Sequence, residues 1–334
     1  MGTLYTFDMT AQSWIITGGA GYIGSHIADE FLANGKDVVI YDTLHQGLET
    51  RIDYLRKKYK KEIPLVLADI RDENALMATL KKFKPHGLVH TAALKAVGES
   101  MERPHEYFEV NFHATTRMLE ILDDCNIHHF IFSSTAAVYG APDYSNPIKE
   151  QDEKKPISPY GASKLAAENE VNKFLSTPGN YGTSLRFFNV VGTKSRELID
   201  NSVENLVPIV IDKLKAGQPP VIYGSDYPTP DGTCIRDYVD VRDVARAHLA
   251  VANSTKALPL AMNVGTGHGR SVREVIQLVG ATAGHSNVAI VELDRRMGDS
   301  ASLCAEVSLI RNTIGHIAQY SFEESIESLF LPEL

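Results

Sequence analysis

Through the first half of the chain, short runs of apolar residues alternate with longer amphipathic segments. The short runs have the length of strands, and strands that are apolar on both faces belong in a sheet covered on both sides. The longer segments carry apolar residues three and four positions apart, which is the spacing of a helix with one buried face. We expect strands at residues 14–17, 38–42, 63–68, 87–91, 129–132 and 183–187, helices at residues 22–34, 72–83, 104–125 and 158–174, and a lysine-rich amphipathic stretch at residues 51–61.

This alternation predicts an α/β fold of the Rossmann type, with a doubly wound parallel sheet of six or seven strands and right-handed crossovers. We place this domain at residues 13–187 and a smaller mixed α/β domain at residues 188–334, where the pattern loosens. Residues 1–12 hold no lysine, arginine or apolar run, so we expect a loose arm and no signal peptide. In the second domain we expect helices at residues 201–214, 241–253 and 271–282, and strands at residues 219–223 and 262–265.

A glycine-rich turn separates the first predicted strand from the first predicted helix. Gly18, Gly21 and Gly24 give it the spacing G-x-x-G-x-x-G. In a βαβ unit, the first glycine permits the tight turn, the second lets the backbone approach a pyrophosphate, and the third lets the helix pack close to the sheet. The N–H groups at the start of the helix also attract an anion. The turn therefore predicts a dinucleotide site.

Two carboxylates follow the next two predicted strands. Asp42 ends the second strand, where a carboxylate accepts hydrogen bonds from ribose hydroxyls and repels a 2′-phosphate, so it favours NAD over NADP. Its alternative role is a loop cap. Asp69 follows the third strand and can receive an adenine amino group, or it can cap the helix that comes next.

Tyr160 and Lys164 lie four positions apart on a predicted helix and therefore share one face. A tyrosine hydroxyl has a pKa of about 10 in water and is a poor base at neutral pH. A neighbouring ammonium and a positive nicotinamide ring both favour the phenolate, which suits the pair to general acid–base catalysis. Taken alone, however, most tyrosine–lysine pairs of this spacing are surface contacts.

Three hydroxyl residues, Ser133, Ser134 and Thr135, end the strand that precedes this helix. Open parallel sheets place their ligand sites at the carboxyl ends of the strands, so we expect one of the three to hydrogen-bond a substrate oxygen. Together with the glycine-rich turn and Tyr160, they predict an enzyme that moves a proton and a hydride at a carbinol carbon.

The composition narrows the possible partners. The formal net charge of −9 argues against a nucleic-acid or anionic-membrane partner. No apolar run approaches the roughly 18 residues of a membrane span. Cys125, Cys234 and Cys304 are odd in number and far apart, which favours reduced thiols in the cytoplasm and neither disulfides nor a metal site.

Three longer stretches make the chain resemble the extended short-chain dehydrogenase/reductase superfamily, and within it the family of UDP-glucose 4-epimerases. They are HTAALKAVGES at residues 90–100, FSSTAAVYG at residues 132–140 and YGSDYPTPDGTCIRDY at residues 223–238. The third is the most specific, because generic short-chain reductases lack it. The resemblance covers nearly the whole chain from residue 13 onward. It implies NAD-dependent 4-epimerisation of a UDP-hexose, UDP-glucose or UDP-galactose, through a transient 4-keto sugar.

The resemblance also implies roles at the matching positions. Tyr160 would be the base and Thr135 its hydroxyl partner, with Lys164 completing the catalytic set. Besides the three glycines, NAD would be held by Tyr22, Ile23, Asp42, Asp69, Ile70, Ala92, Lys95, Asn111, Lys164 and Phe188. The UDP-sugar would be held by Asn189, Asn205, Leu206, Arg236, Arg296, Asp299 and Leu303, in addition to Thr135 and Tyr160.

The two arginines of this set also suit a diphosphate on chemical grounds, because a guanidinium donates two parallel hydrogen bonds to phosphate oxygens. Each has a plainer alternative. Arg236 could form an ion pair with its neighbour Asp237, and Arg296, which follows Arg295, could be a solvated surface charge.

The chain departs from the family pattern at several positions. Thr135 is followed by two alanines, where related 4,6-dehydratases carry an acidic pair, and this argues against dehydration. Phe187 replaces a tyrosine that is often found two residues before Asn189. The loop at residues 190–204 is shorter than in well-known members, and Leu303 stands at the position that controls pocket size. These last two departures leave a UDP-N-acetylhexosamine, UDP-uronate or UDP-pentose open as the substrate.

A non-catalytic NAD-binding sensor is the alternative of a different class, and the intact Thr135, Tyr160 and Lys164 speak against it. The helices expected at residues 104–125 and 158–174 carry apolar residues on more than one face. This pattern fits an internal core, and it also fits the four-helix homodimer contact that the resemblance implies.

Overall fold

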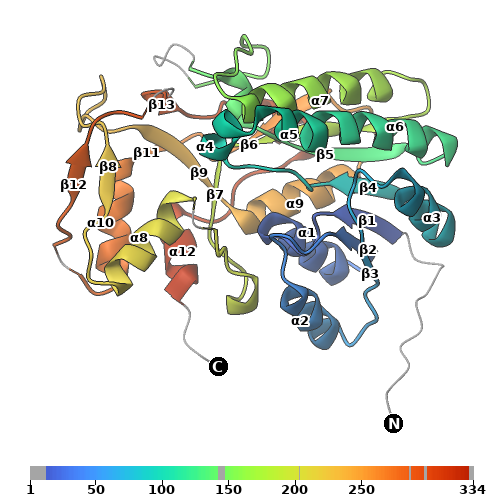
Figure 1. Ribbon diagram of the computed structural model, residues 1–334, viewed down its shortest axis with the longest axis horizontal. Helices are drawn as coiled ribbons and strands as arrows, with labels where there is room; N and C mark the ends of the chain where they lie inside the picture. The colour runs from blue at the N-terminus through green and yellow to red at the C-terminus, as the bar shows by residue number, and fades with distance from the viewer. Residues whose placement is uncertain (1–12, 142–146, 203, 286, 297–298, 331–334) are drawn as a thin grey trace.

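The computed structural model describes residues 13–141, 147–202, 204–285, 287–296 and 299–330, so the arm expected at residues 1–12 lies outside the described residues. The chain forms a larger lobe built on one sheet and a smaller lobe beside it (Figure 1). Within the described part of the chain, no helix has the length and apolar character needed to cross a membrane.

The larger lobe contains a seven-stranded sheet in which every neighbouring pair is parallel. The strand order is β3-β2-β1-β4-β5-β6-β10. The direction of winding reverses between β1 and β4, which is where doubly wound sheets bind their ligands. The predicted Rossmann-type sheet is confirmed. Its strands are β1 (Ser13–Thr17), β2 (Asp37–Asp42), β3 (Leu65–Leu67), β4 (Gly87–His90), β5 (His129–Thr135), β6 (Tyr181–Phe187) and β10 (Ala261–Val264).

Helices cover both faces of this sheet, because successive side chains of each strand point to opposite sides. Trp14 and Ile16 of β1 pack in one apolar cluster, and Ile15 packs in another. The first cluster is closed by α1 (Tyr22–Ala33), α2 (Glu49–Tyr59) and α9 (Val241–Ala252). The second is closed by α3 (Glu73–Phe83), α6 (Ala114–Asp124) and α7 (Pro159–Leu175), which lie on the other side of the sheet in Figure 1.

The helix expected at residues 104–125 is present but is not one regular α-helix. After α4 (Val97–Glu102) it runs as α5 (Pro104–Phe108), a π-helical turn at Glu109–His113, and α6. A π turn inserts one extra residue into the helical register and is frequently found at functional sites. Asn111, a predicted cofactor contact, lies inside it.

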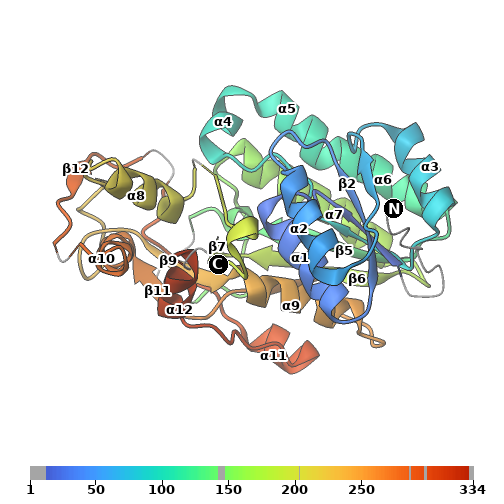
Figure 2. The same cartoon turned by 90° about the horizontal axis from the view of Figure 1, so that it is seen from below.

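The smaller lobe has its own apolar core, formed between short strands and the helices that Figure 2 shows grouped away from α1 and α2. Its strands are β7 (Asn189–Val191), β8 (Val221–Tyr223), β9 (Ile235–Asp240), β11 (Gly269–Ser271), β12 (Val291–Leu293) and β13 (Ser302–Leu303). Its main helices are α8 (Leu206–Lys215), α10 (Val272–Thr282) and α12 (Phe322–Glu327), while α11 (Ser308–Ile314) lies near β10.

Two features of the second half of the chain differ from what the sequence predicts. Residues 188–334, expected to form the second domain, contribute α9 and β10 to the larger lobe. The helix expected from residue 201 begins only at Leu206, because Asp200 accepts hydrogen bonds from the Ser202 backbone (3.0 Å) and the Asn205 side chain (2.6 Å). Such local side-chain bonds compete with the helix for backbone groups.

Candidate active site

The glycine-rich turn lies at the carboxyl end of β1, where the winding reverses. Gly18 has φ +67°, and a Cβ there would lie 2.7 Å from the Ala92 backbone nitrogen. A side chain at Gly24 would collide with the Gly18 carbonyl oxygen. Gly21 is the N-cap of α1, and neither a side-chain cap nor an acidic residue occupies the first turn. The turn is therefore close-packed, and the positive end of α1 is left open to an anion such as a pyrophosphate.

Asp42 lies directly beside this turn and is 8% exposed. Its Oδ2 accepts a hydrogen bond from the Ala20 backbone (3.0 Å), and its Oδ1 accepts one from the Leu44 backbone (2.8 Å). The carboxylate thus fixes the turn, as in the loop-cap alternative, and it lies at the end of β2, the position for which the sequence predicts a ribose contact. The two interpretations are compatible.

Asp69 has a different environment from the one expected. Its Oδ1 accepts a hydrogen bond from Arg71 Nε (3.0 Å) and its Oδ2 accepts one from Arg71 Nη2 (2.7 Å), and this side-chain contact with Arg71 lowers the pKa of Asp69. The alternative role as a helix cap is wrong, because Asp72 is the N-cap of α3 and accepts from the Ala75 backbone at 3.0 Å. Ile70, next to Asp69, is buried.

Asn111 links the two halves of the candidate site. Its Nδ2 donates to the Leu94 carbonyl (2.9 Å) and to Ser163 Oγ (3.1 Å), while its Oδ1 accepts from the Leu94 backbone (2.8 Å). Leu94 lies in the loop after β4, between Ala92 and Lys95, and Ser163 directly precedes Lys164 on α7. The π turn therefore connects the predicted cofactor loop to the predicted catalytic helix.

Thr135 and Tyr160 are brought together at the carboxyl end of β5. A hydrogen bond with Thr135 lowers the pKa of Tyr160, while burial is the larger effect and raises it. We expected Lys164 to lower this pKa, and in the structure it does not contribute. The Lys164 ammonium lies over the Phe132 ring instead, 4.0 Å from the ring centre, and burial lowers the pKa of Lys164 to about 7.

Only one of the three strand-end hydroxyls faces Tyr160. Ser133 Oγ lies 3.2 Å from His248 Nε2, and Ser134 Oγ donates to Glu168 Oε2 at 2.8 Å. Both serines are therefore engaged by buried partners. Thr135 accepts a hydrogen bond from the Ala137 backbone (3.1 Å) and is the hydroxyl that contacts Tyr160.

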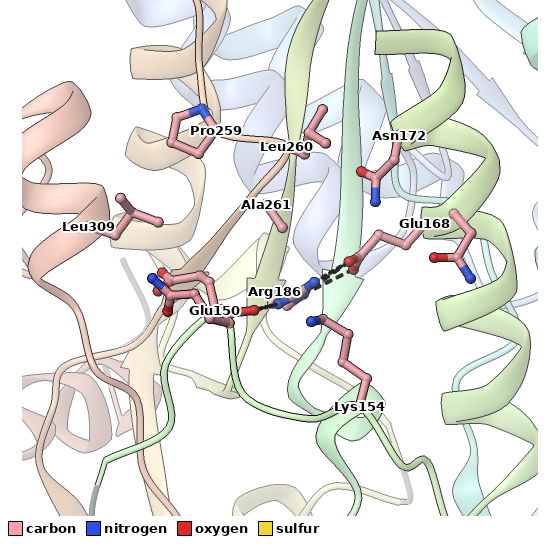
Figure 3. A pocket seen from close by; sticks show the side chains of 11 residues that line it. Glu150, Lys154, Glu168, Asn172, Arg186, Pro259, Leu260, Ala261 and Leu309 are labelled. Atoms are coloured by element: carbon pink, nitrogen blue, oxygen red, sulfur yellow. Dashed lines mark hydrogen bonds and ion pairs between the residues drawn. The ribbon is translucent and has the colours of Figure 1, made fainter. Parts of the chain in front are cut away.

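A buried ion pair between Arg186 and Glu168, which the sequence analysis did not predict, lies next to this end of β5, where Glu168 also binds Ser134. Arg186 Nε donates to both carboxylate oxygens of Glu168 at 3.1 Å, and its Nη1 donates to Tyr139 Oη at 2.7 Å. Figure 3 shows the pair at a cavity of about 500 Å³ that Glu150 and Lys154 also line. The available signal was a charged residue, Arg186, inside a strand predicted for the interior of the sheet, since a charge there needs a buried partner.

In the smaller lobe, Arg236 lies on β9 and is directed to the segment before β13. Its Nη1 donates to the Ser300 carbonyl (2.8 Å), and its Nη2 lies 3.4 Å from Asp299 Oδ1. The alternative ion pair with Asp237 is wrong, because that buried carboxylate accepts hydrogen bonds from Thr266, Gly267 and Ala305. Two predicted substrate residues, Arg236 and Asp299, are thus adjacent.

The remaining predicted substrate residues come from four other elements. Asn189 begins β7, Asn205 is the N-cap of α8, and Leu206 is the first residue of that helix. Leu303 pairs with Arg236 across β13 and β9, and it packs in one apolar cluster with Phe188 and Ala136, the residue after Thr135. Arg296 is exposed, as the alternative of a solvated surface charge predicts, and its guanidinium carbon lies 3.8 Å from the centre of the Tyr223 ring.

The comparison with known proteins shows the family to which the chain belongs. Residues 14–265 match the model of the NAD dependent epimerase/dehydratase family. The UDP-glucose 4-epimerase of Streptomyces lividans is 35% identical over 306 residues, which cover 90% of each chain.

Solved structures extend the similarity to the fold. UDP-glucose 4-epimerase from Bifidobacterium longum, in complex with NAD⁺ and UDP, superposes with a TM-score of 0.88 at 33% identity, covering 95% of this chain and 96% of that one. The enzyme from Stenotrophomonas maltophila, with bound NAD and formylated UDP-arabinopyranose, gives a TM-score of 0.89 at 32% identity, covering 96% and 97%. The chain therefore belongs to the NAD dependent epimerase/dehydratase family and is similar over nearly its whole length to UDP-glucose 4-epimerases.

Proposed function

We propose that this chain catalyses the NAD-dependent 4-epimerisation of a UDP-hexose, interconverting UDP-glucose and UDP-galactose through a transient 4-keto sugar. The observation that carries the proposal is the contact of Thr135 with Tyr160 at the carboxyl end of β5. This contact lies on the sheet that also presents the glycine-rich turn. The similarity to UDP-glucose 4-epimerases over nearly the whole chain supports it.

In this proposal, the larger lobe binds the cofactor. The open N-terminus of α1 suits the pyrophosphate, and Asp42 suits the adenosine ribose. Bound NAD supplies a hydride acceptor that later returns the hydride. The other residues we assign to NAD are Gly18, Gly21, Tyr22, Ile23, Gly24, Asp69, Ile70, Ala92, Lys95, Asn111, Lys164 and Phe188.

At the reacting carbon, Tyr160 removes the proton of the sugar 4-hydroxyl and later returns it to the 4-keto oxygen. Thr135 hydrogen-bonds the same oxygen and also stabilises the Tyr160 phenolate, since its hydrogen bond lowers the pKa of Tyr160. The sugar must turn over in the pocket between the two transfers, so the protein has to grip the UDP firmly and the hexose loosely.

In this proposal, the smaller lobe binds the UDP part of the substrate. We assign the diphosphate to Arg236 and Arg296, whose side chains are held by the Ser300 carbonyl and the Tyr223 ring, respectively. Preorganised guanidinium groups lose little freedom when they bind phosphate. The further substrate residues in this proposal are Asn189, Asn205, Leu206, Asp299 and Leu303.

The test is to incubate the purified protein with single UDP-sugars, without added NAD, and to read the products by NMR. We expect UDP-galactose and UDP-glucose to interconvert. A panel with UDP-N-acetylglucosamine, UDP-glucuronate and UDP-xylose decides the sugar range. A protein that contains NAD and leaves the whole panel unchanged would contradict the proposal and favour a non-catalytic sensor.

We also propose that the protein acts in the cytoplasm as a homodimer. The three cysteines, all within the described residues, form no disulfide. Val97 (52% exposed) and Met101 (58% exposed) lie on α4, close to α5 and α7, and burial in a dimer would cover such apolar side chains. Size-exclusion chromatography with light scattering tests the dimer, and a monomer at micromolar concentration would contradict it.

A further inference from the structure

Arg51 carries a charged side chain and is almost completely buried. It lies in the first turn of α2 and is 1% exposed. Its Nη1 donates to the Ala20 carbonyl of the glycine-rich turn at 3.1 Å. Its Nη2 donates to the Ile199 carbonyl at 2.7 Å and to Asn201 Oδ1 at 3.1 Å. One guanidinium therefore joins the dinucleotide turn to a segment almost 150 residues later in the chain, at a sequence separation of 148.

That segment, residues 199–202, is called the strap here. It belongs to the loop between β7 and α8, and Lys95 holds it at its other end, because Lys95 Nζ donates to Ser202 Oγ at 3.0 Å. Arg51 follows β2, whereas Lys95 follows β4, and these two strands flank β1 in the sheet. The strap thus crosses the carboxyl end of β1, which is the crevice where a doubly wound sheet binds a dinucleotide.

A second contact supports the same arrangement. The Tyr22 hydroxyl, in the first turn of α1, donates to the Gly192 carbonyl at 2.6 Å. The loop that carries the strap is therefore tied to the helix that would receive the pyrophosphate.

Opening the strap would be costly. The Arg51 guanidinium is buried, its Nε has no hydrogen-bond partner among the described residues, and without the strap it would keep only the Ala20 carbonyl. A buried cation that loses its acceptors is strongly unfavourable. Burial lowers the pKa of Arg51, and the carboxylate of Asp200, which belongs to the strap, raises it, so this acidic group favours the closed arrangement.

We propose that Arg51 is a positioning residue that latches residues 199–202 over the dinucleotide turn and so slows the release of NAD. This inference rests on the proposed function, in which one NAD serves every catalytic cycle and has no need to leave. The strap crosses the crevice and is hydrogen-bonded on one side to Arg51 and on the other to Lys95. Both residues belong to the larger lobe, to which we assign the cofactor.

The experiment measures NAD release directly. Full-length protein is loaded with NADH and mixed with excess NAD, and the loss of NADH fluorescence gives the dissociation rate. We expect Arg51→Met to release NADH roughly tenfold faster, and Asn201→Ala and Ser202→Ala to release it roughly threefold faster. The control is Arg56→Met on the same helix, because Arg56 contacts Ile63 and Asp53 and not the strap, so its rate should stay within about twofold of wild type.

The two strap variants keep the proposal falsifiable if Arg51→Met folds poorly, since both leave Arg51 and its contact with Ala20 in place. Unchanged release in Asn201→Ala and Ser202→Ala would overturn the latch, even if Arg51→Met is fast. Failure of the proposed function looks different: the wild type would retain NADH, show the expected order of rates, and convert no UDP-sugar.

Discussion

The ammonium nitrogen of Lys164 lies 4.0 Å from the centre of the Phe132 ring. Burial at this position lowers the pKa of Lys164 to about 7, and the Glu168 carboxylate one helical turn further on raises it. The ordinary value for a lysine is about 10.4. Among the three catalytic residues that we assign, Lys164 is therefore the one whose charge changes in the neutral range.

Replacing Lys164 by methionine should stabilise the folded chain at low pH. In the wild type, the cost of burying the ammonium is present in full below pH 7, and it declines as the pH rises from 7 toward the unfolded value. Lys164→Met should therefore raise the melting temperature by about 3 °C at pH 6 and by less at pH 9. Differential scanning fluorimetry checks this against Lys173→Met, an exposed lysine of the same helix. A gain that does not depend on pH would refute the explanation.

Tyr160→Phe should abolish nearly all turnover, because it removes the only group that we assign to take the proton. The loss should be about a thousandfold, within the range for a missing general base. Bound NAD, measured by release from the denatured protein, should stay at the wild-type level. Tyr181→Phe, on a half-exposed tyrosine at the other end of the sheet, is the matched control. Turnover near the wild-type rate in Tyr160→Phe would discard the proposed base.

Thr135→Val should move the acidic limb of the pH–rate profile to higher pH. The hydrogen bond from this threonine lowers the pKa of Tyr160, so its loss raises the pKa, and the phenolate then forms only in more alkaline solution. Initial rates of UDP-galactose conversion between pH 5 and 11 measure the limb, since burial raises the pKa of Tyr160 above its ordinary value near 10. Thr135→Ser keeps the hydroxyl and should restore its position. An unmoved limb in Thr135→Val would show that the contact does not tune the base.

Buried neutral histidines should make the fold sensitive to acid. The pKa of His129 is lowered to about 3, mainly by burial, so below its ordinary value near 6.5 the unfolded chain binds more protons than the folded one. Stability therefore falls as the pH drops from 6.5 toward 3. The other histidines with pKa values lowered in this way to about 3 or 4 are His26, His90, His248 and His316.

The test is His129→Phe. His129 packs against Trp14 and Tyr181, and its buried Nδ1 has no hydrogen-bond partner in the part of the chain that the structure describes, so a phenyl ring fits that aromatic environment. The midpoint of acid unfolding, followed by circular dichroism, should shift to lower pH. His105→Gln, at a histidine whose side chain is 89% exposed, should leave the midpoint in place. An equal shift in both variants would argue against burial as the cause.

Leu303→Tyr should narrow the sugar pocket. Leu303 packs with Phe188 and Ala136, so a larger side chain there projects toward the Thr135 end of β5. We expect the ratio of UDP-N-acetylglucosamine turnover to UDP-galactose turnover to fall. The control is Leu293→Tyr, at a 49% exposed position of β12. If the ratio does not change, Leu303 does not control the pocket.

Much of the sheet could be predicted because strands such as β1, β2 and β4 are buried on both faces and carry short runs of apolar residues. Val38, Val39 and Ile40 illustrate this: neighbours in sequence, they pack in two clusters on opposite sides of the sheet. The glycine-rich turn could be predicted for a similar local reason, since Gly18 and Gly24 are required by contacts within and beside the turn itself.

Pairings between distant residues could not be predicted in this way. The sequence does not reveal that Ser134 binds Glu168 while Thr135 binds Tyr160, because both hydroxyls end the same strand and differ only in the direction they face. Asp69 likewise has an ordinary cofactor-site position, and its bond to Arg71 depends on one side-chain conformation. Such outcomes are decided by tertiary neighbours and not by local pattern.

The position of β10 has a consequence for how the protein is made. Among the strands of the described residues, β10 pairs with β6 alone, yet more than seventy residues, which include α9 and part of the smaller lobe, separate the two in the chain. During synthesis, the open edge of β6 stays without its neighbour until residue 264 has left the ribosome. A nascent chain arrested before that point would carry an unpaired strand edge, which is free to pair with the edge of another chain and so to aggregate.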